Sequence, residues 1–340
     1  MKFNSKKIMN VSLLAFSSVL FISHTHASCS VSSTNRTITI TVPSISLFEN
    51  GEASSQFESG MSCEGFSAAF ANMTYLKYRV EQMSNTFKNS QTGEQLYANL
   101  YDTDNGAISS GLEKDMSRFS LLNFFSGPNG SLPFYYQLPA GQNVSPGIYD
   151  TDVPFRIRWY YSVPAFAAAG LGFFFESPKF KRGALGIGFR WGDGVESVQT
   201  LRIRVLPDCR ILAQNVNFGT AAFAGQFEPI QTSMGIRCSI NTPYIVSLNN
   251  GLYPQDGNQR SMKSQSSNDF MKYEIYKNAT SERWGSGSES WSSLNATTNP
   301  GIHDAITQQG YVFTTKVLDS NSDNLPAGIY QDTVTVEVSF

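Results

Sequence analysis

Cysteine is the residue type in this 340-residue chain whose spacing most directly implies chemistry. The four cysteines form two sequence-local pairs, Cys29 with Cys63 and Cys209 with Cys238. An even number of cysteines in an exported chain implies disulfides rather than metal ligation, and the leader described below marks this chain for export. We therefore expect two bridges, Cys29–Cys63 and Cys209–Cys238, each stabilising its own part of the chain by roughly 3–4 kcal/mol in the chain-entropy model.

Histidine, the usual base of nucleophilic enzymes and the commonest metal ligand, is nearly absent. Two of the three histidines lie in the leader and only His303 remains, so neither a Ser–His–Asp triad nor a histidine metal cluster can be assembled. The carboxylates are plentiful, but on a surface of this kind they are expected to be solvated. The sequence predicts no enzyme activity, no metal and no cofactor.

One acidic run resembles a calcium loop in part. In DTDNGAISSGLE (102–113), Asp102, Asp104 and Glu113 occupy positions 1, 3 and 12 of such a loop. However, Gly106 takes a ligand position, and Ala107 stands where the loop needs glycine. We expect an ordinary polar loop here.

The first 27 residues have the organisation of a secretory signal peptide. A basic start is followed by an apolar core over 8–22 and a small-residue cleavage site that ends at Ala27, which is too short and wrongly flanked for a membrane span. Losing three lysines with this leader leaves 22 basic against 27 acidic residues, a net charge of −5. A nucleic-acid partner is therefore not expected.

An internal repeat indicates the architecture. The stretches 132–161 and 311–340 each contain an alternating strand, a polar loop, the motif PGIYD or PAGIYQD, and a second alternating strand. Short period-two strands between Gly, Pro, Asn and Ser clusters are typical of antiparallel β-sandwiches. We expect two immunoglobulin-like domains, with a boundary just before Cys209 and no persuasive helix.

The two repeats differ in how they end. After its strand at 148–161, the first continues into another alternating strand, SVQTLRIRVLP (197–207), which completes a sandwich. The second has strands expected near 214–220, 230–240, 243–249, 270–277, 310–318 and 329–340, and the sequence then ends. We expect this second sandwich to lack its seventh strand and to expose an unpaired edge.

The second repeat resembles a spore-coat-U-type pilin of archaic, Csu-type chaperone–usher pili. The resemblance is carried by Cys209, Cys238 and the motifs NFG (217–219), YIVSLNNG (244–251), RSM (260–262), KYEIY (272–276), WGSG (284–287) and PAGIYQDTVTVEVSF (326–340). With Cys29 next to the expected cleavage site, the chain offers no N-terminal donor arm. It is therefore similar to a two-domain tip adhesin of such a pilus, with residues 28–207 as the adhesin domain and 208–340 as the pilin domain.

The resemblance implies a set of partners and a location. A periplasmic chaperone, and then an adjacent pilin subunit, would insert the missing strand, and an outer-membrane usher would assemble the fibre. The chain is thus expected to pass through the periplasm to the pilus tip at the cell surface. In this interpretation the groove for the inserted strand is lined by Val334, Val336, Val338 and Phe340.

The first repeat carries unusually apolar connections. Three of them, within 67–74, 118–131 and 162–180, meet at one pole of an immunoglobulin-like sandwich, and a contiguous exposed apolar patch normally marks an interaction surface. We expect attachment to hydrophobic, abiotic surfaces, and so biofilm formation, through Val163, Pro164, Ala165, Phe166, Ala167, Ala168, Ala169, Leu171, Phe173, Phe174, Phe70, Met73, Leu121, Leu122, Phe124 and Phe125. The basic cluster FKRG (180–183) that follows is expected to be solvated.

Three alternatives remain open at this point. The apolar run 163–175 is also long enough to be a buried strand or a plug over the sandwich end. A lectin-like tip would bind a host glycan on aromatic platforms such as Trp159, Tyr160, Tyr161 and Trp191. A structural minor pilin would have the same architecture without an adhesive role.

Overall fold

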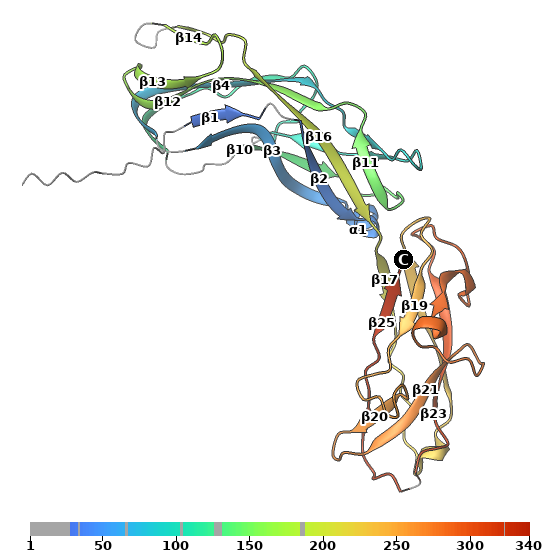
Figure 1. The fold of residues 1–340 in the computed structure, drawn as a ribbon. Helices are drawn as coiled ribbons and strands as arrows, with labels where there is room; N and C mark the ends of the chain where they lie inside the picture. The colour runs from blue at the N-terminus through green and yellow to red at the C-terminus, as the bar shows by residue number, and fades with distance from the viewer. Residues whose placement is uncertain are drawn as a thin grey trace, which may run out of the picture.

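The protein consists of two all-β parts joined end to end (Figure 1). The computed structural model describes residues 28–32, 35–64, 67–102, 105–125, 131–183, 188–322 and 324–340. Among these residues, every β-sheet lies wholly within 28–206 or wholly within 209–339, and we call these the N-terminal and C-terminal parts. The all-β prediction is confirmed, and within the described residues no helix is long and apolar enough to cross a membrane.

A ten-stranded sheet dominates the N-terminal part. Along its main path the order is β6-β5-β11-β16-β12-β4-β8, with β13 paired to β12, β2 to β16 and β9 to β4. The strands are β2 (Arg36–Pro43), β4 (Ser67–Gln82), β5 (Thr86–Lys88), β6 (Gln95–Tyr97), β8 (Glu113–Asp115), β9 (Arg118–Phe125), β11 (Gly147–Thr151), β12 (Phe155–Ala168), β13 (Leu171–Glu176) and β16 (Val195–Leu206). Period-two alternation points Phe155, Ile157 and Trp159 of β12 into the core.

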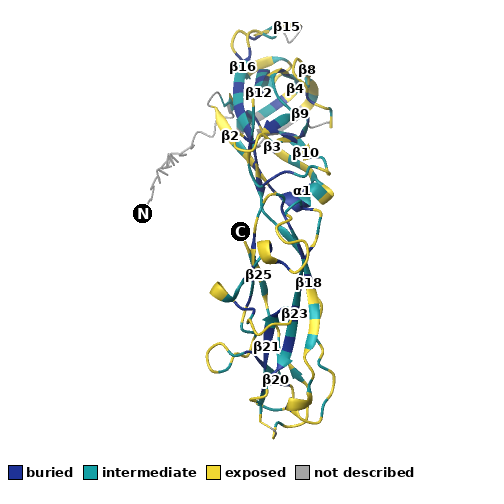
Figure 2. Ribbon diagram, turned by 90° about the vertical axis from the view of Figure 1, so that its right-hand side faces the viewer, coloured by how far each residue is buried: buried dark blue, intermediate teal, exposed yellow. Residues whose placement is uncertain are grey.

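A second, four-stranded sheet with the order β1-β3-β10-β7 packs against the first. Its strands are β1 (Ser28–Val31), β3 (Glu52–Glu64), β7 (Asn99–Tyr101) and β10 (Ser131–Leu138). The core between the sheets is aromatic: Phe134 stacks on Trp159 with ring centroids 6.1 Å apart and meets Tyr78 edge-on. Dark blue, buried stretches along the strands mark this core in Figure 2.

Strand β16 closes the N-terminal sandwich from within the chain. On one edge it pairs antiparallel with β11 and β12, and on the other it pairs in parallel with β2. The residues that alternate into the core are those expected from the sequence, Leu201, Ile203 and Val205. The position between β11–β12 on one side and β2 on the other is therefore filled by a strand of the same chain, β16.

The C-terminal part has a six-stranded sheet of order β17-β18-β23-β21-β20-β24 and a three-stranded sheet of order β22-β19-β25. The strands are β17 (Cys209–Leu212), β18 (Ile230–Cys238), β19 (Ile245–Leu248), β20 (Ser261–Ser264), β21 (Phe270–Lys277), β22 (Trp291–Ser292), β23 (Gln309–Val317), β24 (Tyr330–Gln331) and β25 (Val336–Ser339). The strands expected near 230–240, 243–249, 270–277 and 310–318 are found. The strand expected at 214–220 is not: the first strand is β17, which precedes that stretch, and residues 213–220 are not in a strand. The last expected strand is interrupted over 332–335.

The repeated motif performs the same structural task in both parts. The hydroxyl of Tyr149 lies 2.6 Å from the carbonyl of Ser145, and that of Tyr330 donates to the carbonyl of Pro326 at 2.9 Å. Both tyrosines therefore reach back four residues, as in the tyrosine corner of immunoglobulin-like sandwiches. The repeat in the sequence is a repeated tyrosine corner, in β11 of the N-terminal part and at the start of β24 in the C-terminal part.

A short helix contradicts the expectation that the chain has none. Helix α1 (Ser44–Asn50) is seven residues long, and its N-cap, Pro43, makes no side-chain cap hydrogen bond. Instead the Asp208 carboxylate, at the start of the C-terminal part, accepts the amide hydrogen of Ile45 at 2.7 Å. The helix depends on this tertiary contact, which local propensity does not reveal.

We call the region where the two parts meet the joint. Glu49 of α1 forms ion pairs with Arg210 and Arg237, and the hydroxyl of Ser44 bonds to that of Ser239. These two arginine side chains lower the pKa of the Glu49 carboxyl, and the hydrogen bond from Arg237 is the largest cause. Further bonds link Asn143 to the Asp304 carbonyl and Asn241 to the Ser145 hydroxyl.

Both disulfides form in the expected pairs. Cys29 is bonded to Cys63 and Cys209 to Cys238, in each case across adjacent antiparallel strands. In the calcium-like run, the buried Asp102 carboxylate accepts hydrogen bonds from Tyr78 and Lys114 and from the amide of Gly106, while Asp104 lies outside the described residues. Asp102 is therefore a structural anchor for its loop.

Candidate functional site: an apolar tip and an open groove

The described residues of the three apolar segments lie in β-strands and one tight turn and not in irregular loops, which corrects the sequence interpretation. Residues 67–74 belong to β4, 118–125 to β9, and 162–176 to β12 and β13. β12 and β13 form a β-hairpin, and β9 and β12 both pair with β4. The strands β9, β4, β12 and β13 therefore lie side by side, at the end of the N-terminal part that is farthest from the C-terminal part (Figure 1).

Large apolar side chains on these strands face solvent. Phe173 is 78% exposed, Leu171 60% and Phe166 50%, all on the β12–β13 hairpin. The neighbouring strands add Phe70 from β4, and Leu121 together with Phe119 from β9. We call these six residues the apolar tip. Phe119 lies on one of the three predicted segments but is not among the predicted binding residues; its alternation with Leu121 is the signal that could have added it.

The other predicted binding residues divide into three groups. Pro164 and Ala165 are buried and Val163 packs against the core, so they support the hairpin and do not belong to its exposed surface. Ala168 and Ala169 are exposed, whereas Ala167, Phe174 and Met73 are half-buried. For Leu122, Phe124 and Phe125 only the backbone is described, within β9, and their side chains lie outside the described residues.

The turn of the β12–β13 hairpin explains its small residues. Ala169 and Gly170 both have positive φ, 48° and 81°, as a two-residue type I′ turn requires. Gly172, with φ 138°, leaves no room for a Cβ, which would lie 2.1 Å from the carbonyl oxygen of Phe166. The small residues of this run let a tight ribbon form, and the large ones alternate outward from it.

The aromatic residues considered for glycan binding do not form an open platform. Trp159 and Tyr161 are buried in the core. Tyr160 and Trp191 are edge-on to each other and share Lys77, whose ammonium lies 4.7 Å and 4.9 Å from their ring centroids. Their faces are thus engaged by a cation within the protein.

The C-terminal part contains a groove of about 590 Å³ that runs between residues 213–218 and residues 330–336. The floor is apolar and aromatic, with Met234, Tyr273 and Phe313 from the core sheet and Trp284 from the segment after β21. Val334 and Val336 line the groove and Val338 packs against the same core, whereas Phe340 is 54% exposed and outside the lining.

Along one wall of the groove, β25 pairs with β19 through only one of its two edges in the described part of the chain. The amide of Thr335 donates to the Asn249 side chain at 2.9 Å, and its carbonyl accepts from the Asn249 amide at 3.1 Å. Backbone groups of successive residues in a strand point to opposite edges. The amides and carbonyls of Val334, Val336 and Val338 therefore face away from β19, toward the groove.

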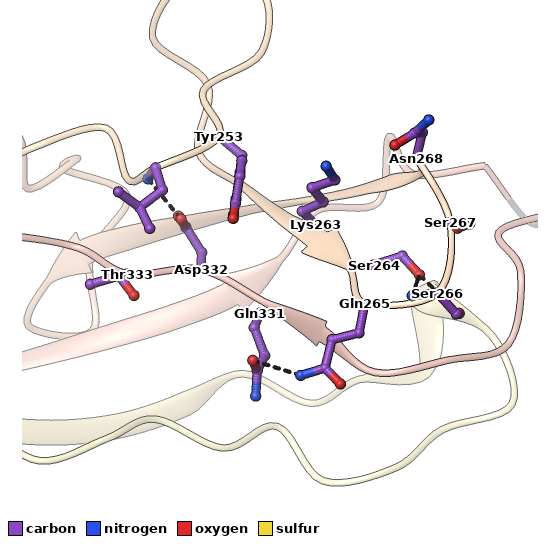
Figure 3. Close-up of a pocket in the computed structure, with 11 residues that line it drawn as sticks. Tyr253, Lys263, Ser264, Gln265, Ser266, Ser267, Asn268, Gln331, Asp332 and Thr333 are labelled. Atoms are coloured by element: carbon purple, nitrogen blue, oxygen red, sulfur yellow. Dashed lines mark hydrogen bonds between the residues drawn. The ribbon is translucent and has the colours of Figure 1, made fainter.

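At the pole farthest from the N-terminal part, the groove opens into a polar pocket of about 560 Å³ (Figure 3). Gln331, Asp332 and Thr333 line both spaces. Asp332 accepts hydrogen bonds from the amide of Leu252 at 2.8 Å and from the hydroxyl of Tyr273 at 2.7 Å. The apolar floor thus ends at a polar boundary, and this end of the groove is open to solvent.

Comparisons with known proteins agree with this geometry. The family model of the Spore Coat Protein U domain matches residues 196–337. A crystal structure of the CsuC–CsuE chaperone–tip adhesion subunit pre-assembly complex, from archaic chaperone–usher Csu pili of Acinetobacter baumannii, contains a chain 64% identical to this one. The alignment covers 92% of this chain and 100% of that chain, with a TM-score of 0.72.

Two further comparisons add no support. The CupB6 tip adhesin from Pseudomonas aeruginosa aligns over 92% of this chain and 94% of its own at 8% identity, but its TM-score of 0.31 carries no argument. A search among curated proteins finds no match.

Proposed function

Because this chain belongs to the family of two-domain tip adhesin subunits of archaic chaperone–usher, Csu-type pili, we propose that its apolar tip attaches the pilus to hydrophobic surfaces. Members of this family are exported pilus subunits and not enzymes. The observation that carries the proposal is the apolar tip itself: six large apolar side chains exposed on the adjacent strands β9, β4, β12 and β13, which lie at the end farthest from the pilin part (Figure 1). Attachment to abiotic surfaces in this way supports biofilm formation.

The size of the apolar tip is sufficient for attachment. With about 100 Å² presented by each of its six side chains, about 600 Å² leaves water on contact. At about 25 cal/mol per Å², this corresponds to about 15 kcal/mol before the costs of ordering and orientation are subtracted. The interaction is non-directional, so it selects for apolar character and not for a particular molecule.

The test is a double substitution, Phe166→Asp with Phe173→Asp, in assembled pili. We expect attachment to polystyrene to fall to the background of cells without pili, while pilus number is unchanged. Attachment by the unmodified protein should be abolished by mild detergent and resist free sugars and salt. Sugar-sensitive attachment would indicate a lectin, and unchanged attachment by the double variant would indicate a structural subunit.

We further propose that the C-terminal groove binds an extended strand supplied by another protein. In the N-terminal part, β16 occupies the equivalent position between β11–β12 and β2. An inserted strand would pair with the backbone groups of Val334, Val336 and Val338, giving about six hydrogen bonds at about 1 kcal/mol each. Alternate apolar side chains of that strand would cover Met234, Trp284 and Phe313 on the groove floor.

The partners follow from this groove. The relative's structure is a chaperone–tip subunit pre-assembly complex, so we assign a periplasmic chaperone as the first supplier of the strand. We assign the adjacent pilin subunit as the final supplier and an outer-membrane usher as the exchange site. The next subunit must lie beyond the polar pocket, because the N-terminal part occupies the other end of the C-terminal part (Figure 1).

A matched pair of substitutions on β25 tests the groove. Val336 lines the groove, whereas its neighbour Glu337 is exposed on the other face. Val336→Arg should abolish co-purification with the chaperone and lead to degradation, because a charge would enter the apolar groove. Glu337→Arg should behave like the unmodified protein. Equal recovery of both variants with the chaperone would contradict the groove assignment.

A further inference from the structure

We propose that Arg182 is a positioning residue that holds strand β4 and the β12–β13 hairpin of the apolar tip together. The proposal rests on the adhesive function proposed above. Arg182 belongs to the basic cluster 180–183, for which the sequence predicts solvated surface. The structure contradicts that expectation at two positions: the Arg182 side chain is only 9% exposed, and Phe180 is buried.

The contacts of Arg182 connect β4 to the β12–β13 hairpin. Its guanidinium donates to the Met73 carbonyl on β4 at 2.9 Å, and to the carbonyl and hydroxyl of Ser162 on β12 at 3.0 Å and 2.8 Å. On β13 its Nε lies 3.5 Å from the Glu176 carboxylate, and the guanidinium lies 3.7 Å from the ring centroid of Phe174. One cation therefore joins β4 to both strands of the β12–β13 hairpin.

Arginine suits this position because its planar fork can serve several acceptors at once. Burial lowers the pKa of Arg182, but a guanidinium stays charged at neutral pH. Its Nη1 atom is buried without a hydrogen-bond partner among the described residues. Glu176 supplies an opposite charge beside the guanidinium, but the unsatisfied Nη1 donor still costs stability, and this cost favours a functional reason for the residue.

The segment that carries Arg182 is held by strand pairing and by aromatic packing. It is β14 (Lys181–Arg182), which pairs with β15 (Phe189–Arg190). Phe180 stacks on Phe189, and both contact Tyr75 of β4. The β14–β15 hairpin is thus packed against β4, one of the strands that carry the apolar tip.

A second polar contact acts near the turn of the β12–β13 hairpin. The buried Asn72 side chain of β4 accepts the amide hydrogen of Gly170 at 3.0 Å and donates to the Phe70 carbonyl at 2.6 Å. Arg182 therefore holds this hairpin at Ser162, and Asn72 holds it at the turn, at Gly170. Between them the exposed Phe166, Leu171 and Phe173 are kept in a fixed arrangement.

The experiment compares Arg182→Met with Arg190→Met, an exposed arginine on the same β14–β15 hairpin. In the full chain bound to its chaperone, hydrogen–deuterium exchange over 163–175 should become about 30-fold faster in Arg182→Met, because charge-assisted hydrogen bonds are lost. Exchange in β2 and β16 should be unchanged. Attachment of pili to polystyrene should fall about tenfold, with Arg182→Lys intermediate.

Two outcomes would overturn the proposal. In the first, exchange over 163–175 and attachment are the same in Arg182→Met and Arg190→Met. In the second, exchange increases equally throughout the N-terminal part, which would make Arg182 a general stability residue. Failure of the adhesive function is distinguishable, because the Phe166→Asp and Phe173→Asp variant would then still attach, whatever the exchange data show.

Discussion

The contribution of a single exposed leucine offers the sharpest test of attachment through the apolar tip. Leu171, at the start of β13, is 60% exposed, and Leu294, in the C-terminal part and outside both the groove and the tip, is 57% exposed. The substitutions Leu171→Asp and Leu294→Asp are therefore matched in residue type, in exposure and in the charge they introduce. They differ in whether the side chain belongs to the apolar tip.

The expected size of the effect follows from the exposed area. Full burial of a leucine side chain is worth about 2.5 kcal/mol, so 60% of it amounts to about 1.5 kcal/mol. That loss alone weakens attachment about tenfold. The new carboxylate would also lose water on contact, which raises the penalty further. Folding stability should change little in either variant, because both positions are exposed.

The assay is retention of piliated cells on polystyrene under increasing flow, with pilus number and thermal unfolding measured in parallel. We expect Leu171→Asp to reduce retention at least tenfold and Leu294→Asp to leave it unchanged. Equal retention of the two variants, with both folded and assembled, would refute the reasoning, whether both attach normally or both fail.

Three other predictions concern folding and the joint. Tyr149→Phe should lower the free energy of unfolding of the N-terminal part by about 1–2 kcal/mol in a denaturant titration, because it removes a buried hydroxyl beside Ser145, whereas the more exposed Tyr330→Phe should have a smaller effect. Replacing Cys209 and Cys238 by serine should cost roughly 3 kcal/mol and lower the yield of chaperone complex. Arg210 and Arg237 lower the pKa of Glu49 in the folded state. The stabilisation by Glu49 is therefore present above the unfolded-state pKa and is lost as the pH falls through the folded-state pKa. Glu49→Gln should remove this part of the acid dependence of unfolding, measured by denaturant titration at several pH values.

The sandwich architecture was predictable because its determinants are local. Alternation in Leu201, Ile203 and Val205 specifies one strand with one buried face, and cysteines close in sequence specify cross-strand bridges. The second repeat shows the same alternation in Val334, Val336 and Val338. These patterns do not require knowledge of distant contacts.

The details of the site depend on contacts that sequence cannot provide. The run 162–180 gives an apolar signal, but only its pairing with β4 makes it a hairpin whose Pro164 and Ala165 are buried while Phe173 is exposed. For Arg182 the sequence predicts a surface position, because the residue is charged and lies in a basic cluster, whereas its side chain is only 9% exposed. Helix α1 depends on Asp208, which is 164 residues from Ser44 along the chain.

The joint has a consequence for the proposed attachment, because a fibre held at its tip would be pulled sideways by flow. The covalent chain crosses between the two parts once, at Pro207 and Asp208, and a single unsupported crossing would allow the parts to rotate. Here Glu49, Asn143 and Ser145, from separate segments of the N-terminal part, all bond to the C-terminal part. In the proposed pilus, sideways load on the apolar tip would therefore be resisted by several spaced contacts, and the subunit would turn as one body about its junction with the next subunit.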